Sequence, residues 1–187
     1  IKYSMRLVKQ FPDYPDSYKA LYVLGFCYTI MGELDKAASI WQKFLKDYGS
    51  NQLAGEVAYR LADYYFDEGD ETQMGVLGPK LFKKAAADVD NEIIYPSSTY
   101  KLAWTYYRLD QYQLALDYFL DVLNWSEKKN NEVFVPETLQ YIAIIFADEN
   151  RDSSLDFRGF LEQNKGGKYA SDMAVAYGDI MLDNSKY

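Results

Sequence analysis

The chain has 187 residues, of which 49% are hydrophobic and 26% are charged, and its net charge is -8. This composition is typical of a globular domain with a sizeable core, and an acidic chain without a basic stripe is a poor partner for nucleic acid. The single cysteine excludes an internal disulfide, and the lack of histidine excludes His-based triads and His metal sites. No run approaches the roughly 18 to 20 apolar residues that a membrane-spanning helix needs. Because the sequence starts without Met and inside a patterned segment, we expect it to be part of a larger chain or complex.

Apolar residues recur at helical spacing from the first residues onward. Residues 1–10 are predicted to be the last helix of a preceding repeat. Two helices are predicted next, at about 18–31 and 34–48, with Gly32 as the stop between them. So short a connection makes the two helices antiparallel neighbours, and residues 16–49 are therefore predicted to be one helical hairpin.

The same organisation continues along the rest of the chain. We predict further repeats at residues 52–88, 94–125 and 134–163, and the start of a truncated one at 168–187. An irregular turn is expected at Gln73–Pro79, before a helix of about ten residues. The third repeat is expected to begin its first helix after Pro96 and to end near Trp125, with a polar loop following it.

One residue pattern recurs in these repeats and sets their spacing. Its first full copy is Leu24-Gly25-x-x-Tyr28, Ala37 and Trp41, and its second is Leu102-Ala103-x-x-Tyr106, Ala115 and Phe119. Partial copies begin at Leu61, Ile142 and Tyr177, so the five first residues are separated by 37, 41, 40 and 35 residues. A constant hairpin core with variable linkers is typical of an array whose hairpins bury their faces by stacking. We therefore predict an all-α, right-handed α-solenoid of about nine or ten helices without a sheet.

These residues resemble the tetratricopeptide repeat, whose pattern of Leu-Gly-x-x-Tyr, a small residue and an aromatic residue is met nearly in full by the two complete copies. The resemblance covers essentially the whole chain and implies a scaffold that binds other proteins. Two departures are a period longer than the usual 34 or so residues and the absence of a closing proline after Tyr48 and Trp125. The long linkers, such as residues 11–22, look like those of bacterial envelope members of the family: Tol-Pal-associated periplasmic proteins, lipoproteins of outer-membrane assembly and lipoproteins of gliding motility. That narrower resemblance favours a periplasmic or outer-membrane-associated location.

If the first helices of the repeats line the inner wall, the helix face opposite the core belongs to a ligand. Helical spacing places eleven residues on that face: Tyr22, Phe26, Thr29, Tyr59, Asp63, Phe66, Tyr100, Trp104, Tyr107, Gln140 and Ile144. Seven are aromatic, and Glu56 and Asp67 add acidic edges, which suits a peptide with apolar anchors and a basic residue. Tyr22 and Tyr100 have a second interpretation, in which they pack between helices, whereas Trp104 and Tyr107 favour the groove.

Candidate chemistry is weak elsewhere, so we expect no catalytic residue, cofactor or metal. Asp148-x-Asn150-x-Asp152-x-Ser154 begins like a calcium loop but lacks the central Gly and the closing Glu. The stretch at residues 75–80 lacks the length and ending of a phosphate loop. The leading hypothesis is a non-catalytic scaffold that binds a protein or peptide in its concave groove. A rigid spacer inside a larger assembly is the first alternative, and a glycosidase with paired carboxylates is the remote one.

The small residues of the pattern are predicted to lie where two helices approach closely, and the aromatic residues to fill the gap toward the next hairpin. Replacing Ala115 by Leu is therefore expected to lower the free energy of unfolding by about 1 to 3 kcal/mol through overpacking. Thermal unfolding of the two proteins checks this, and an unchanged melting temperature would contradict the packing assignment.

Overall fold

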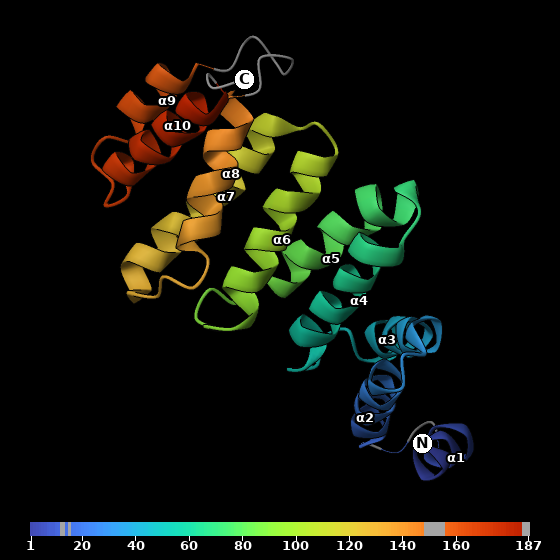
Figure 1. Cartoon of the computed structure of the whole chain (residues 1–187). Helices are drawn as coiled ribbons and strands as arrows, with labels where there is room; N and C mark the ends of the chain where they lie inside the picture. Colours follow the sequence, from blue (N-terminus) through green and yellow to red (C-terminus); the bar gives the residue numbers. More distant parts are fainter. Residues whose placement is uncertain (12–13, 15, 148–155, 185–187) are drawn as a thin grey trace. The chain divides into compact units, whose positions relative to one another are not determined.

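The computed structural model describes residues 1–11, 14, 16–147 and 156–184, and these residues form an all-helical protein without a strand. Figure 1 shows the helices along the chain. Their bounds are α1 Lys2–Gln10, α2 Ser17–Ile30, α3 Leu34–Tyr48, α4 Ala54–Glu68, the π-helix η1 Gln73–Leu77, α5 Gly78–Ala85, α6 Ile94–Arg108, α7 Tyr112–Lys129, α8 Val135–Ala147, α9 Phe157–Gln163 and α10 Ala170–Asn184. The all-α class is thus confirmed, and consecutive helical hairpins are consistent with an α-solenoid.

The chain divides into two compact units, Ile1–Ser98 and Thr99–Tyr187, and the boundary between them falls within α6. In the first unit α2 packs against α1 and α3, and α4 packs against α3 and α5. In the second unit α8 packs against both α7 and α10. Helices α2, α3 and α4 thus pack in sequence order, whereas α8 packs on α10, two helices further along the chain. The division of the chain into individual repeats stays a prediction.

The two hairpins that carry full copies of the pattern turn in the same way. Gly32 (φ 72°) and Asp110 (φ 56°) both adopt the left-handed conformation, eight residues after Leu24 and Leu102 respectively. The following amide donates to the carbonyl of the pattern's tyrosine, from Glu33 to Tyr28 at 3.0 Å and from Gln111 to Tyr106 at 2.9 Å. This bond closes the helix end and reverses the chain within three residues.

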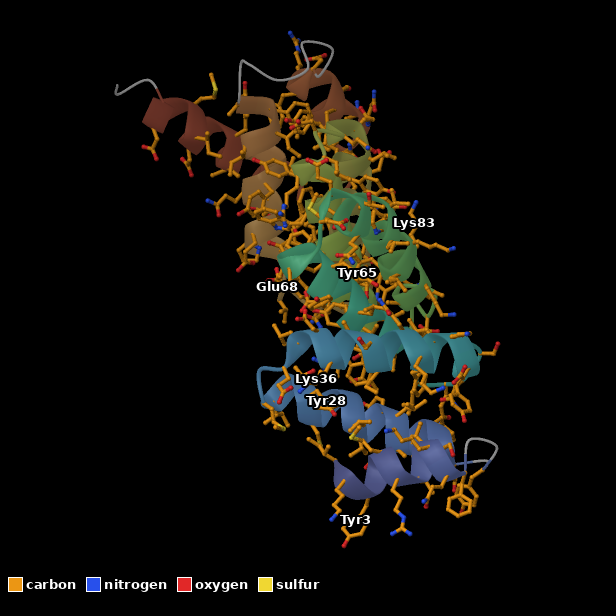
Figure 2. All side chains as sticks on the ribbon, turned by 90° about the vertical axis from the view of Figure 1, so that its right-hand side faces the viewer. Tyr3, Tyr28, Lys36, Tyr65, Glu68 and Lys83 are labelled. Atoms are coloured by element: carbon orange, nitrogen blue, oxygen red, sulfur yellow. The ribbon has the colours of Figure 1, made fainter. Side chains whose placement is uncertain are left out.

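Figure 2 shows the side chains on the ribbon, with Tyr3, Tyr28 and Lys36 among the labelled residues. Tyr3 projects from α1 and is 85% exposed, whereas Tyr28 is buried. Lys36 of α3 lies over the ring of Tyr28, with 5.7 Å between its Nζ and the ring centroid. The long side chain thereby covers apolar surface at the hairpin turn and keeps its charge in water.

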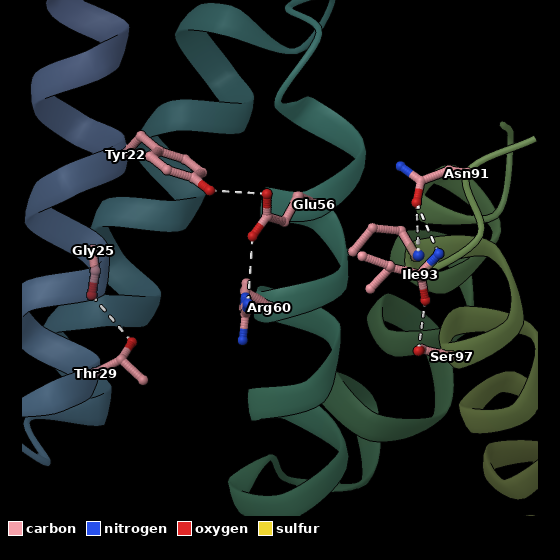
Figure 3. Close-up of polar contacts among 9 residues, drawn as sticks. Tyr22, Gly25, Thr29, Glu56, Arg60, Asn91, Ile93 and Ser97 are labelled. Carbon is pink, nitrogen blue, oxygen red and sulfur yellow. Dashed lines mark hydrogen bonds and ion pairs between the residues drawn. The ribbon is translucent and has the colours of Figure 1, made fainter. Parts of the chain in front are cut away.

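Three helix boundaries differ from the expectations, each for a local reason. The irregular turn at 73–79 is a π-helical turn that runs directly into α5, with Pro79 in the first turn of that helix, where no amide is needed. The first helix of the third repeat begins at Ile94, before Pro96, because the Asn91 side chain accepts the Ile93 and Ile94 amides at 3.2 and 2.9 Å (Figure 3). The second helix continues to Lys129 through the expected loop, because Ser126 is buried and Asn130 provides a left-handed cap.

Small residues lie where the two helices of the first hairpin approach closely, as the pattern predicts. A Cβ atom on Gly25 would lie 2.3 Å from the Trp41 ring, so the indole rests directly on the glycine. We expected Trp41 to fill the gap toward the next hairpin. Its ring lies against Gly25 of its own hairpin, and it also belongs to the core cluster that includes Val57 and Leu61 of α4. In the second unit Ala103 and Ala115 are fully buried.

Replacing Gly25 by Ala is expected to destabilise the protein, although alanine favours helix by up to about 1 kcal/mol. The overpacking against Trp41 outweighs that gain, and we expect a net loss of about 1 to 2 kcal/mol in the free energy of unfolding. Gly178→Ala in α10 is the matched control, because a Cβ there meets nothing within 4 Å and the helical preference alone should stabilise. Urea unfolding measures both, and equal effects of the two substitutions would contradict the close approach.

Candidate functional site

The eleven residues predicted for the binding face fall into two sets, one in each unit. The first unit holds Tyr22, Phe26, Thr29, Tyr59, Asp63 and Phe66, and the second holds Tyr100, Trp104, Tyr107, Gln140 and Ile144.

In the first unit, Tyr22 and Phe26 form one aromatic cluster on α2. Their ring centroids are 4.9 Å apart, and both rings also contact Trp41 of α3, at 6.2 and 5.5 Å. The Tyr22 hydroxyl donates to a carboxylate oxygen of Glu56 on α4 at 2.8 Å (Figure 3). The same carboxylate is 3.4 Å from Arg60, whose guanidinium carbon lies 4.9 Å from the centre of the Phe26 ring.

Arg60 therefore occupies the place that we expected a ligand's basic residue to take. It provides the cation for the Phe26 ring and the counter-charge for Glu56, both from within the chain. A ligand cation would have to displace Arg60 from both contacts. We conclude that this part of the predicted face is engaged internally by its neighbouring helix.

The other residues of the first set are placed differently from one another. Thr29 is exposed, and its hydroxyl donates back to the Gly25 carbonyl at 3.1 Å (Figure 3). Tyr59 packs with Phe82 of α5, at 6.1 Å between ring centroids, and this burial raises the pKa of Tyr59 to about 12. Asp63 and Phe66 are partly buried. Tyr59 packs with the cluster around Ala58 and Ala85, whereas Tyr22 and Phe26 pack with the cluster around Trp41.

In the second unit, Trp104 and Tyr107 of α6 form a continuous aromatic surface with Tyr141 of α8. The Trp104 ring lies 4.2 Å from Tyr141 and 5.5 Å from Tyr107, and Tyr107 lies 5.8 Å from Tyr141. Tyr112 extends the surface, at 6.1 Å from Tyr107. We call these four residues the aromatic surface. All four residues keep part of their area exposed, and their mutual contacts pack the rings against one another.

Tyr100 lies beside this surface but packs more deeply. Its ring stacks on Phe134 at 5.0 Å and also contacts Phe119 at 6.0 Å. Burial raises the pKa of the Tyr100 hydroxyl above its ordinary value. These contacts favour the second interpretation given above, in which Tyr100 packs between helices.

Sequence reasoning missed Arg60 and Tyr141, which hold the same position in their repeats. Arg60 stands immediately before Leu61, and Tyr141 immediately before Ile142, the first pattern residues of their repeats. Each contacts an aromatic ring of the previous repeat, and that ring lies two positions after the first pattern residue there. Arg60 contacts Phe26 in this way, and Tyr141 contacts Trp104. Aligning the repeats column by column would have placed Arg60 and Tyr141 in the same register.

The last two predicted residues lie on α8. Gln140 is exposed and lines a groove of about 360 Å³ between α8 and α10, whereas Ile144 is partly exposed and does not line it. The α10 side of this groove carries Asp172, Val175 and Asp179, none of which we had assigned to the face. Val175 stands two positions before Tyr177, as Gln140 stands two before Ile142, so the same register would have identified it.

Within the described ranges, no group of three or more Asp, Glu, Cys or His side chains could hold a metal ion. The calcium-like segment at residues 148–154 lies outside those ranges. No helix that the structure describes is sufficiently long and apolar to span a membrane.

Comparison with known protein families gives a match to the Tetratricopeptide repeat at residues 19–51 and 97–124. These two matches support a tetratricopeptide repeat protein. They fall on the α2–α3 hairpin and on most of α6 and α7, where the pattern is complete and the left-handed turns are alike. Comparison with curated proteins and with solved structures gave no match.

The two matched repeats are of a type with a known general role. Tetratricopeptide repeats bind protein or peptide partners and are typically non-catalytic scaffolds. The two matched segments contain both candidate contacts described above, because Tyr22 and Phe26 lie in the first and Trp104 and Tyr107 in the second. The aromatic surface is therefore built on a matched repeat of this type and on α8, the first helix of the next hairpin.

The bond between Tyr22 and Glu56 predicts a pH dependence of stability. Burial and then the hydrogen bond to Glu56 raise the pKa of Tyr22 to about 12, above its ordinary value of 10.0. Since the folded state holds this proton more tightly than the unfolded chain, the contribution is complete below pH 10 and is lost between pH 10 and about 12. Replacing Tyr22 by Phe should make the fall in stability over that range shallower. Urea unfolding measured from pH 8 to 12 checks this, and parallel curves for the two proteins would contradict it.

Proposed function

We propose that this protein is a non-catalytic interaction scaffold whose aromatic surface on α6, α7 and α8 binds a partner protein or peptide. The observation that carries the proposal is the set of partly exposed rings at Trp104, Tyr107, Tyr112 and Tyr141, which contact one another across three helices. Tryptophan and tyrosine dominate the energetics of interfaces because they bury a large area with few rotatable bonds.

The ligand we propose carries apolar side chains as its anchors and some basic character. Apolar anchors suit the ring faces, which attract both aliphatic and cationic groups. We infer the basic character of the ligand from the net charge of the chain, which is -8. This charge attracts a positively charged partner over a distance of about the Debye length, which depends on the salt concentration. The contacts among the four rings hold these side chains in place before the ligand arrives. Binding therefore costs little conformational entropy of the side chains.

A bacterial envelope or motility complex is the setting we propose for this scaffold. Its support is the resemblance of the long linkers, such as residues 11–22, to those of envelope proteins with these repeats. Fractionation of cells of the source organism, with antibodies against this chain, tests the setting. Recovery with the cytosol would contradict it.

Substituting Trp104 and Tyr107 by Ala tests the aromatic surface. Peptides selected from a phage-displayed random library against the wild-type chain are the probe, and their affinity is measured by fluorescence polarisation. We expect the double variant to lose about tenfold or more in affinity, because about 1.4 kcal/mol or more is typical of an aromatic hot spot. Tyr107→Ala alone leaves the contact between Trp104 and Tyr141 in place. If the double variant fails to fold, we expect this single variant to lose about tenfold or more in affinity for the same peptides.

Tyr118→Ala is the matched control, since it removes a partly exposed tyrosine from α7 that stacks on Tyr106 rather than on the aromatic surface. Thermal unfolding confirms that each variant is folded at the temperature of the assay. Affinity that falls equally in the control, or does not fall in the Trp104 and Tyr107 variants, would reject the surface. That outcome would favour a rigid spacer.

A further inference from the structure

The groove between α8 and α10 joins an apolar floor to an acidic rim. Leu139, Val175 and Ile180 line it with aliphatic side chains, and Asp172 and Asp179 line it with carboxylates. Val175 is 62% exposed, so part of the floor is open to solvent. The volume of about 360 Å³ is enough to receive side chains from a partner.

The carboxylates of this groove have no counter-charge. Within the part of the chain that the structure describes, neither Asp172 nor Asp179 makes a hydrogen bond or an ion pair through its side chain, and neither α8 nor α10 contains a lysine or an arginine. The first unit differs, because Arg60 there already neutralises Glu56. An incoming basic group would thus find the α8–α10 groove open.

The groove residues of α10 form a single stripe. Asp172, Val175, Ala176 and Asp179 follow one another at helical spacing of three, one and three residues, which places them on one side of the helix. The two carboxylates are seven residues apart, or about 10.5 Å along the axis. The stripe therefore reads acidic, apolar, apolar, acidic.

We propose that this groove docks an amphipathic helix of a partner protein with two basic residues seven positions apart and apolar residues between them. The inference deepens the proposed function and rests on it, since it assigns a second contact on the same first-helix face. Two helices lying side by side share the rise of about 1.5 Å per residue, so the basic residues meet both carboxylates while the apolar ones fill the floor. An extended segment fits less well. At about 3.3 Å per residue it would span the distance between the two carboxylates with residues three apart, and in an extended chain the side chains of such residues point to opposite faces.

The probe is an alanine-based peptide of about 15 residues, blocked at both ends and labelled with fluorescein. It carries two Arg seven positions apart and two Leu between them, and a companion peptide has the two Arg four positions apart. Polarisation measured with the whole chain at low salt should show tighter binding of the first peptide. We expect Asp172→Asn with Asp179→Asn to weaken it about fivefold and to reduce its salt dependence, since two partly screened ion pairs are lost.

Asp117→Asn with Asp121→Asn is the matched control, because it removes the same charge from exposed positions on α7. It should change the affinity less than twofold or so, as expected of charges away from the contact. Val175→Lys should abolish binding, because it places a positive charge between the two carboxylates, where it repels the arginines of the peptide. Circular dichroism verifies that each variant is folded. Val175→Thr is the substitute if Val175→Lys unfolds, with a weaker but measurable loss.

Absence of probe binding, equal binding of the two peptides, or equal losses in the two aspartate pairs would overturn the proposal. A dimer of this chain that Val175→Lys disrupts, seen by analytical ultracentrifugation, would also overturn it by assigning the groove to a second copy. Library peptides that need Trp104 and Tyr107, together with a probe that does not bind or does not need Asp172 and Asp179, would overturn this inference alone and leave the proposed function standing. Probe binding that depends on the aspartates supports the groove even if the aromatic surface proves inert.

Discussion

The close approach of two helices within a hairpin is the constraint on which the rest of this structure depends. Trp41 can lie flat across α2 only because Gly25 has no side chain, and Ala103 and Ala115 are fully buried in the corresponding hairpin. A larger residue would push the helices apart and shift the rings that both helices carry. The left-handed turn at Gly32 and at Asp110 reinforces this, since it returns the chain within three residues. The positions of the rings that both helices carry therefore depend on the distance between the two helices.

The same register produces two surfaces of different chemistry. In two repeats, the side chain just before the first pattern residue contacts a ring of the previous repeat. Where that side chain is Arg60, the ring of Phe26 is covered by a cation that also pairs with Glu56. Where it is Tyr141, the ring of Trp104 gains an aromatic neighbour, and Trp104 remains partly exposed. The residue type at this one position therefore gives the two rings different surroundings.

Charge changes along the chain in a similar way. Glu56 of α4 is engaged by Tyr22 and Arg60, whereas Asp172 and Asp179 of α10 line a groove in which the described residues place no cation. A repeat array can thus keep its core constant while neighbouring positions on the same helix face carry unrelated chemistry. Such an arrangement is suited to binding a partner at more than one point.

The sequence by itself determined the helices, their pairing into hairpins and the repeat to which they are similar. These features depend on local spacing: apolar residues at helical intervals, Gly32 at the turn, and small residues at fixed offsets from aromatic ones. It also placed Trp104 and Tyr107 on one helix face, because helical geometry alone fixes which residues share a side. The start of α6 ahead of Pro96 was missed, since it depends on a side chain, Asn91, that caps the helix from outside.

Only the tertiary structure decided which members of the predicted face are open. The exposure of a ring depends on what the next helix places over it, and that helix lies more than thirty residues away in the sequence. Arg60 over Phe26, Phe134 on Tyr100 and the uncovered Val175 between two aspartates are all contacts, or missing contacts, between separate helices. Periodicity identifies the side of a helix, but only the packed neighbour determines how much of that side a partner can reach.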